Sequence, residues 1–154
     1  MNFMKLLTPG AVRVISTASS KKRLMHDLAD LADSAYRIPA PQAVEALMER
    51  ESLGPTGVGH GVALPHARIG EIEEVLGAFI LLEKPIDFEA VDRQPVDIVF
   101  ALFAPEEAGV EHLKALALVS RTLRDANFCA KLRANPDPAT LYTILTESQS
   151  VQAA

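Results

Sequence analysis

The sequence predicts an α+β domain with three layers, α/β/α, in which a mixed central β-sheet is flanked by helices on both faces. Two almost uninterrupted apolar runs, VLGAFILL at 75–82 and VDIVFALFA at 96–104, lie between prolines. Runs of this kind are typical of strands that are buried on both faces of a sheet. Segments with helical spacing stand before and after these runs, so helices are available to cover both faces.

The first three predicted elements are a strand and two helices. Residues 11–16, AVRVIS, alternate apolar and polar positions before Ser and Thr, which predicts a short strand leading to a helix cap. Pro41, at a helix start, predicts a later helix that ends near Leu53 and Gly54. Between them, apolar residues recur at helical spacing and predict the first helix: Leu24, Leu28, Leu31 and Ala35.

The first helix opens with three basic residues, Lys21, Lys22 and Arg23. This order opposes the preference for acidic side chains at the positive end of the helix dipole. One interpretation is a solvated basic turn, since exposed charges have weak effects. The other interpretation is a docking patch for an acidic partner surface.

The rest of the chain adds three strands and three helices. Residues 54–61, GPTGVGHG, are predicted to be a loop because of their glycines, and 62–67, VALPHA, to be a short extended segment. The two apolar runs supply the other strands. One helix is predicted from Gly109, a second over 127–133 and a third from about Pro138. The residues that keep helical spacing in the first and third are Leu113, Leu116, Ser120 and Leu123, and Leu141, Ile144 and Leu145.

Length and composition favour one domain over residues 1–154, with an ordered core over about 8–147. The chain is 49% hydrophobic and 23% charged, enough for a substantial core. Its net charge of -5 has the wrong sign for a nucleic-acid partner. No apolar run approaches the roughly eighteen residues of a membrane-spanning helix, and the N-terminus lacks a secretion signal. Cys129 is the single cysteine and cannot form an internal disulfide, so we expect a cytoplasmic protein.

The segment GVGHGVALPHARI, 57–69, is the densest group of candidate functional residues. Gly57, Gly59 and Gly61 alternate, which matches neither a dinucleotide-binding fingerprint nor a P-loop. Glycines here allow positive φ angles and leave backbone N–H groups uncovered. The segment could therefore be an anion-binding nest or simply a tight turn that leads into a strand.

His66 follows this segment and has three possible roles. It could be a metal ligand together with His60 and His112, although a separation of six positions between the first two is not a standard ligand spacing. It could be a core histidine with its hydrogen bonds satisfied. It could also be a nucleophile that accepts a transferable group. We predict no metal and no cofactor.

A nucleophilic imidazole that accepts a phosphoryl group makes specific demands. It must be neutral, with one nitrogen held by a hydrogen bond and the other free, and the arriving charge needs donors already in place. His112 lies in the first turn of the helix after Gly109, on the face that should point to the sheet. Arg50 at the end of the second helix and Arg68 could contact phosphoryl oxygens. All three could equally be ordinary structural or surface residues.

Three stretches together resemble a known family. They are RESLGPTGVGHGVALPHARI, FEAVDRQPVDIVFALFAP and HLKALALVSRTLRD. They are similar to the enzyme IIA domains of the bacterial phosphoenolpyruvate-dependent phosphotransferase system, in the fructose/mannitol class and especially its nitrogen-regulatory branch. The resemblance covers nearly the whole chain. It implies a three-layer fold with a mixed sheet, in agreement with the order of elements.

The resemblance also implies roles for individual residues. His66 would accept a phosphoryl group from an HPr-like phosphohistidine carrier, His112 would be the supporting histidine and Arg50 the supporting arginine, which makes the chain a phosphotransferase. Gly57, Gly59, Gly61 and Arg68 are candidates for a phosphoryl-binding loop. Pro55 and His60 depart from the family pattern, because a serine is common at the first position and Asn, Glu or Lys at the second.

The resemblance implies protein partners as well. The phosphorylation state would control regulated targets, such as potassium transport systems, their sensor kinases and stringent-response regulators. Two alternatives remain open at this point. The chain could be a sugar-specific enzyme IIA that passes phosphate to an enzyme IIB, or an interaction module that works without phosphorylation.

Overall fold

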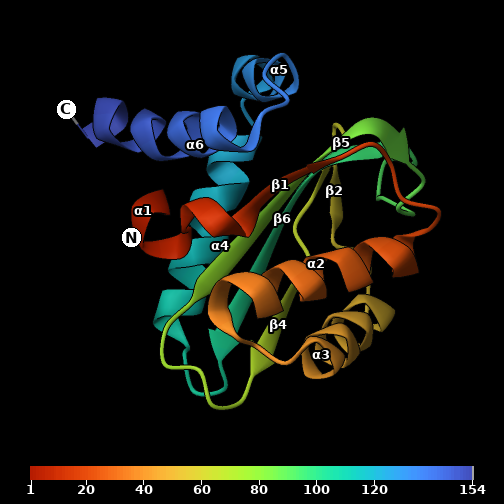
Figure 1. Ribbon diagram of the computed structural model, residues 1–154, viewed down its shortest axis with the longest axis vertical. Coiled ribbons are helices and arrows are strands. Elements are labelled where there is room, and N and C mark those ends of the chain that lie inside the picture. Colours follow the sequence, from red (N-terminus) through yellow and green to blue (C-terminus); the bar gives the residue numbers. More distant parts are fainter. Residues whose placement is uncertain (154) are drawn as a thin grey trace.

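The computed structural model describes the backbone of residues 1–153 and the side chains of residues 1–147. Figure 1 shows the arrangement of the elements. The helices are α1 (Phe3–Leu6), α2 (Lys21–Tyr36), α3 (Ala40–Ser52), α4 (Val110–Leu123), α5 (Ala126–Arg133) and α6 (Pro138–Ala153), with a 3-10 turn at Pro9–Ala11. The strands are β1 (Val12–Ile15), β2 (Gly57–Gly59), β3 (Val62–Ala63), β4 (His66–Ile69), β5 (Leu76–Ile86) and β6 (Val96–Pro105).

All six strands belong to one mixed sheet. The order is β1-β5-β6-β3-β2, and β4 also pairs with β6. β5 and β6 are antiparallel at the centre, whereas β1 is parallel to β5, and β3 and β4 are parallel to β6. β3 pairs with Ile98 and Val99 of β6, and β4 pairs with its C-terminal half from Leu102 onward. The two short strands therefore follow one another along the same side of β6.

Helices cover both faces of this sheet, so the predicted three-layer α/β/α class with a mixed sheet is confirmed. Side chains of a strand alternate between the two faces. Phe79, Phe100 and Leu102 pack with α1, α4 and α6. Ile80 and Phe103 pack on the other face with α2 and α3. None of the helices in the described backbone has the length and apolar character needed to cross a bilayer.

Several predicted boundaries are wrong. β5 does not stop before Pro85 but continues to Ile86, because Pro85 is exposed and the pairing with β6 shifts register between Leu81 and Ile86. An irregularity of this kind tolerates a residue without an N–H group. The core begins earlier than residue 8, since Phe3 is fully buried. The predicted end of the ordered core, near 147, lies at the limit of the described side chains.

Two further segments differ from the sequence prediction. Residues 57–59 were expected in a loop, but they form β2, which pairs with β3 in an antiparallel hairpin. On α4 the face that carries His112 is buried, as predicted, but the stripe of helical spacing that starts at Leu113 is not buried throughout. Leu113 is 68% exposed, whereas His112, Ala115 and Val119 are buried. The apolar side chain of Leu113 therefore lies on the surface beside a buried histidine.

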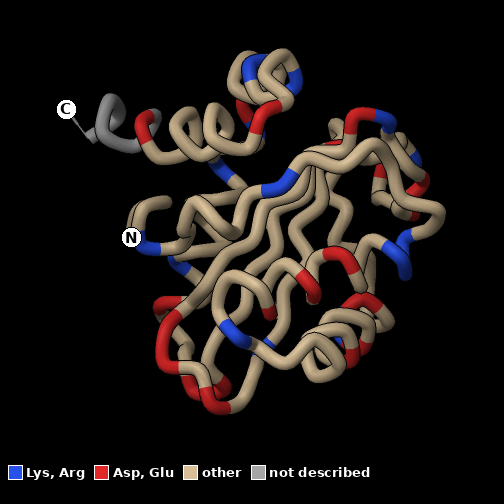
Figure 2. The backbone as a smooth tube through the Cα atoms, in the orientation of Figure 1, with Lys and Arg blue, Asp and Glu red and all other residues tan. Residues whose placement is uncertain are grey.

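The acidic charge is unevenly distributed. Figure 2 shows Asp and Glu residues on the turns that follow β4 and β6. These exposed residues include Glu71, Glu73, Glu74, Glu106 and Glu107. Because like charges repel over several ångströms, this end of the sheet favours approach by basic rather than acidic surfaces.

Gly77 provides a test of the packing between the sheet and the N-terminus. A Cβ atom there would lie 2.7 Å from Cε1 of Phe100 and 3.2 Å from the carbonyl oxygen of Leu6. We expect Gly77→Ala to lower the free energy of unfolding by about 1–3 kcal/mol, the usual range for overpacking. Gly10→Ala is the matched control, because its Cβ would meet nothing within 4 Å. Urea unfolding that gave equal stabilities for the two variants would contradict this packing.

Candidate functional site

His66 is the first residue of β4 and lies between the end of α3 and the start of α4. Its Nδ1 is 2.8 Å from the carbonyl oxygen of Leu64, and its Nε2 is 3.2 Å from Nε of Arg50. The guanidinium can only donate, so Nε2 must accept and Nδ1 must carry the proton that is donated to Leu64. The two contacts therefore fix one neutral tautomer and direct the lone pair of Nε2 toward Arg50.

The backbone around His66 is held from both sides. The N–H of Leu64 donates to the carbonyl oxygen of Thr56 at 2.9 Å, and the carbonyl oxygen of Pro65 accepts from the N–H of Leu102 at 2.9 Å. Proline restricts its own φ and keeps the preceding residue extended. The Leu-Pro dipeptide thus presents the Leu64 carbonyl at a fixed position two residues before the histidine.

Arg50 comes from the last turn of α3. Its Nη1 donates to the carbonyl oxygen of Gly54 at 3.0 Å while its Nε donates to His66. One guanidinium therefore links the loop after α3 to the imidazole. Its planar array of donors leaves further N–H groups for an anion.

His112 lies directly beside His66. The two ring centroids are 5.6 Å apart and the rings meet edge to face at 76°. The His112 residue is only 7% exposed, and no hydrogen-bond partner reaches its buried Nε2 among the residues whose side chains are described. Buried polar atoms are rarely left without a partner. This nitrogen is therefore placed to bind a group that arrives at the site.

Both imidazoles are held in the neutral form. Burial lowers the pKa of His66 below its ordinary value of 6.5; the Leu64 hydrogen bond and Glu51 oppose this shift, and the Arg50 guanidinium reinforces it. Burial also lowers the pKa of His112, and positive charge on His66 and on Arg68 lowers it further. A neutral His66 keeps the lone pair of Nε2 available at neutral pH.

The two histidines open onto a hollow of about 420 Å³ that reaches solvent. Arg68 lines it, and its Nη1 donates to the carbonyl oxygens of Glu106 and Ala108 in the segment before α4. The other lining residues are Ala46, Glu49, Arg50, Leu53 and Ala67. The structure thus brings together the four predicted side chains His66, His112, Arg50 and Arg68, which can receive and neutralise a small anion.

Gly57, Gly59 and Gly61 do not line this hollow, so a phosphoryl-binding role for them stays a prediction. Gly57 and Gly59 lie in β2, and Gly61 lies in the turn of the β2–β3 hairpin. A Cβ on Gly57 would lie 2.7 Å from Cβ of Ala90, and one on Gly61 would lie 2.5 Å from the Arg133 guanidinium. Glycine is required at Gly57 by the close approach of Ala90, and at Gly59 and Gly61 by their positive φ angles.

His60 is likewise separate from His66. It occupies the hairpin turn at a φ of 57°, where its N–H donates to Asp92 and its carbonyl oxygen accepts from Arg133. It lines a different hollow, together with Val58 and Arg124. Within the part of the chain whose side chains are described, no three His, Cys, Asp or Glu residues are grouped as possible metal ligands.

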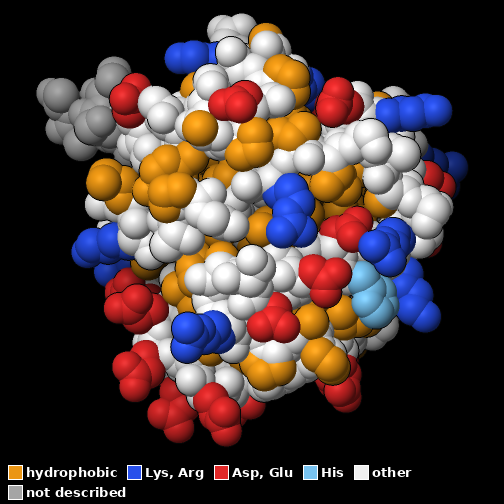
Figure 3. Space-filling model, in the orientation of Figure 1, with side chains coloured by type: hydrophobic (Ala, Val, Ile, Leu, Met, Phe, Trp, Pro, Cys, Tyr) orange, Lys and Arg blue, Asp and Glu red, His pale blue; other side chains and the backbone are white. Residues whose placement is uncertain are grey.

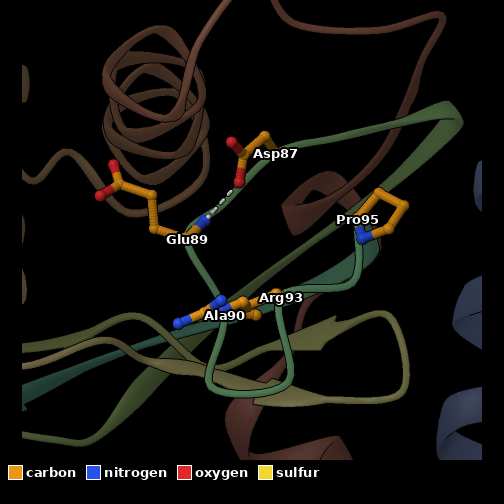
Figure 4. Close-up of a pocket in the computed structure, with 5 residues that line it drawn as sticks. All are labelled: Asp87, Glu89, Ala90, Arg93 and Pro95. Atoms are coloured by element: carbon orange, nitrogen blue, oxygen red, sulfur yellow. Dashed lines mark hydrogen bonds between the residues drawn. The ribbon is translucent and has the colours of Figure 1, made fainter.

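A third hollow, of about 440 Å³, lies in the loop between β5 and β6 (Figure 4). Asp87, Glu89, Ala90, Arg93 and Pro95 line it, and the N–H of Glu89 donates to Asp87 at 2.9 Å. It contains no histidine or cysteine, and its charged side chains are exposed. It therefore lacks a desolvated nucleophile of the kind found around His66.

Sequence reasoning missed three contributors to the site. The Leu64 carbonyl fixes the tautomer of His66, but a backbone oxygen has no signature in residue type. Glu51 and Thr56 hold the loop beside Arg50 through hydrogen bonds. The only available signal was a glutamate next to Arg50. Its burial could not be predicted, because burial depends on tertiary packing that the sequence does not display.

The desolvated histidines predict a pH dependence of stability. A histidine whose folded pKa lies below its unfolded value of about 6.5 destabilises the fold as pH falls from that value to the folded pKa. We expect wild-type protein to lose stability as pH falls from just above the unfolded pKa of about 6.5 to the lower folded pKa values, and His112→Leu to lose less. Urea unfolding across this range measures the difference. Identical pH dependences would contradict the desolvation of His112.

Comparison with known proteins identifies the family of the chain. Residues 5–148 match the family described as "Phosphoenolpyruvate-dependent sugar phosphotransferase system, EIIA 2". The chain is 43% identical over 145 residues to a nitrogen regulatory protein of Bradyrhizobium diazoefficiens. The aligned region covers 94% of this chain and 95% of the relative. It is 40% identical over 131 residues to the nitrogen regulatory protein of Escherichia coli, with coverages of 84% and 80%.

Solved structures show the same fold. The nitrogen regulatory protein IIA-Ntr of Neisseria meningitidis superposes with a TM-score of 0.87 at 31% identity, covering 94% of this chain and 99% of that one. The mannitol IIA structure from Escherichia coli shares the fold with a TM-score of 0.75 at 17% identity, covering 90% of this chain and 98% of that one. The chain therefore belongs to the EIIA 2 family of the phosphoenolpyruvate-dependent phosphotransferase system, where it is similar to the nitrogen regulatory proteins.

Proposed function

We propose that the chain is a phosphocarrier that accepts a phosphoryl group on Nε2 of His66 from an HPr-like phosphohistidine carrier. The observation that carries the proposal is the pair of contacts on His66. Leu64 holds the Nδ1 proton, and Nε2 presents its lone pair beside Arg50 and beside His112, whose Nε2 has no partner among the side chains that the structure describes. This is the arrangement that a nucleophilic imidazole requires.

The transfer balances without a general base or a cofactor. The lone pair of Nε2 attacks the phosphorus as the nitrogen–phosphorus bond of the donor breaks, and the bonding electrons return to the donor imidazole. Nδ1 keeps its proton, so His66 becomes a cationic phosphoimidazole whose N–H still donates to Leu64. Arg50 moves its donation from Nε2 to the phosphoryl oxygens. The His112 imidazole donates from Nε2 to the same group.

Phosphorylation changes the surface that partners meet. It adds about two negative charges to a hollow lined by Leu53, which is 81% exposed, while α4, the helix that carries His112, exposes Val110 and Leu113 to 63% and 68%. A partner that buries these side chains over the unmodified site would have to desolvate the added charge. We propose that this difference controls regulated targets, such as potassium transport systems, their sensor kinases and stringent-response regulators.

A second candidate is a sugar-specific enzyme IIA that passes its phosphoryl group to an enzyme IIB. The chain is 33% identical to the fructose-specific EIIA component of Haloferax volcanii, which favours this alternative. The two functions differ in the next acceptor. Rapid transfer from the phosphorylated chain to a fructose-type or mannitol-type IIB would favour the sugar-specific function.

The test of the proposal is reconstitution of the transfer. Incubation with phosphoenolpyruvate, the first enzyme of the system and the HPr-like carrier should add one phosphoryl group that is stable in base and lost in acid. Intact mass measured before and after acid treatment reports this change. If the chain stays unmodified while the same mixture phosphorylates another enzyme IIA, the proposal is wrong and an unphosphorylated interaction module is favoured.

A further inference from the structure

A buried ion pair lies behind the site, between the start of α2 and the end of α3. Nζ of Lys21 is 2.6 Å from a carboxylate oxygen of Glu51, and the two side chains are 16% and 5% exposed. The same carboxylate accepts hydrogen bonds from the N–H of Thr56 at 3.0 Å and from its hydroxyl. The Lys21 ammonium also lies 4.8 Å above the ring of Phe88.

The stability of the fold does not by itself explain why this pair is charged. Taking two charges out of water is unfavourable, and apolar replacements of buried pairs are often neutral or stabilising. The carboxylate of Glu51 is nevertheless fully engaged by one ammonium and two hydrogen-bond donors. These contacts therefore matter more for the positions of Glu51 and Thr56 that they fix than for the stability of the fold.

The first route from Glu51 to His66 runs through the backbone after α3. Glu51 fixes Thr56, whose carbonyl oxygen accepts from the N–H of Leu64 at 2.9 Å. The Leu64 carbonyl oxygen in turn accepts from Nδ1 of His66 at 2.8 Å. A displacement of Thr56 would move the acceptor that selects the tautomer of His66.

The second route runs through Arg50. The carbonyl oxygen of Glu51 accepts from the N–H of Gly54 at 3.2 Å, and the carbonyl oxygen of Gly54 accepts from Nη1 of Arg50 at 3.0 Å. The Nε of Arg50 is the group that donates to Nε2 of His66. Both nitrogens of the imidazole are thus held by groups that depend on the loop fastened by Glu51.

We propose that Glu51, neutralised by Lys21 and bonded to Thr56, is a positioning residue that sets the tautomer and orientation of His66. The part of this inference that concerns the rate of phosphoryl uptake rests on the proposed function. The part that concerns the tautomer of His66 does not.

Lys21 differs in its role from the other basic residues at the start of α2. Lys and Arg side chains protrude over this region in the space-filling view of Figure 3. Lys22 is exposed, and the exposed Arg23 forms a pair with the partly buried Asp27 at a spacing of four residues. The interpretation as a solvated basic turn therefore suits Lys22 and Arg23, whereas Lys21 belongs to the interior network.

The test uses Glu51→Gln and Lys21→Met in the full chain, with Glu45→Gln and Lys22→Met as exposed matched controls on the same helices. Nitrogen-15 NMR of the ring reports the His66 tautomer. Phosphoryl uptake from the HPr-like carrier reports the rate. We expect both test variants to populate the Nε2–H tautomer and to lose at least about tenfold in rate, since misplacement of a reacting group by about 1 Å can cause a loss of about 10²-fold. Lys21→Arg, which keeps a positive charge at this position, should keep the wild-type tautomer and the wild-type rate that Lys21→Met loses.

A purely structural role would lower the unfolding midpoint of the test variants without moving the His66 tautomer, and that result would overturn the inference. If Glu51→Gln or Lys21→Met does not fold, Thr56→Val decides in its place. That variant keeps the ion pair and removes only the hydroxyl bond, and an unchanged tautomer in it would also overturn the inference. If wild-type protein accepts no phosphoryl group, the proposed function fails while the tautomer measurement still decides the role of Glu51.

Discussion

His66→Ala is expected to abolish phosphoryl uptake. The imidazole supplies the attacking lone pair, and we expect that His112 cannot replace it because the His112 residue is only 7% exposed and its Nε2 is buried. Loss of a nucleophile has lowered rates by about 10⁶-fold in other enzymes, so we expect a fall of at least about 10³-fold. Quenched-flow transfer from the phosphorylated HPr-like carrier measures it.

Two other histidines provide the controls for this prediction. His26 is exposed on α2, and His60 lies in the β2–β3 turn away from the hollow. We expect His26→Ala and His60→Ala to accept phosphoryl groups at close to the wild-type rate. A His66→Ala variant that kept the wild-type rate would move the acceptor to another residue.

Arg50→Met is expected to slow the transfer by about 10²–10³-fold, the usual effect of removing one donor that stabilises developing charge. The guanidinium donates to Nε2 of His66 and to the Gly54 carbonyl, so it both orients the nucleophile and meets the incoming oxygens. Arg50→Lys should recover only part of the rate, because an ammonium is a point charge without the planar array of donors.

The rate of a single turnover distinguishes a slower transfer step from weaker binding of the carrier. At saturating carrier the Arg50 variants should stay slow, since the loss is in the transfer step. Thermal unfolding of each variant gives the control for folding. Arg50→Met that transferred at the wild-type rate would show that the arginine only supports the loop.

The layered fold was predictable because local pattern and tertiary environment agree. The apolar runs at 75–82 and 96–104 lie at the centre of the sheet, where both faces are buried. Ser20 caps α2 by accepting from the N–H of Arg23, as the Ser and Thr residues before the helix suggested. Such features depend on neighbours in sequence, which a single chain displays.

The errors arose where a distant contact decides the structure. Gly57 lies in a strand that pairs with β3, and Ala90, more than thirty residues later, approaches so closely that a Cβ atom would not fit there. Leu113 is exposed although it keeps helical spacing, because the orientation of α4 is set by burial of His112 and Ala115. Neither contact has a signature in local periodicity.

The side chains of the candidate site could be predicted from the sequence, but the groups that hold them in place could not. The proximity of His66 and His112 came from a family resemblance, and the structure places their rings 5.6 Å apart. The Leu64 carbonyl and the Lys21–Glu51 pair became visible only when α2, α3 and β4 were brought together. Buried charges are rare and depend on partners far along the chain.

The central claim is that Nε2 of His66 carries the phosphoryl group while Nδ1 keeps its proton. Nitrogen-15 and phosphorus-31 NMR of the wild-type protein, labelled in its histidines and phosphorylated through the HPr-like carrier, tests this claim directly. The account predicts phosphorus coupling to Nε2 of His66 and a retained Nδ1–H bonded to the Leu64 carbonyl. Phosphorus coupled to Nδ1, or to any other histidine, would contradict it.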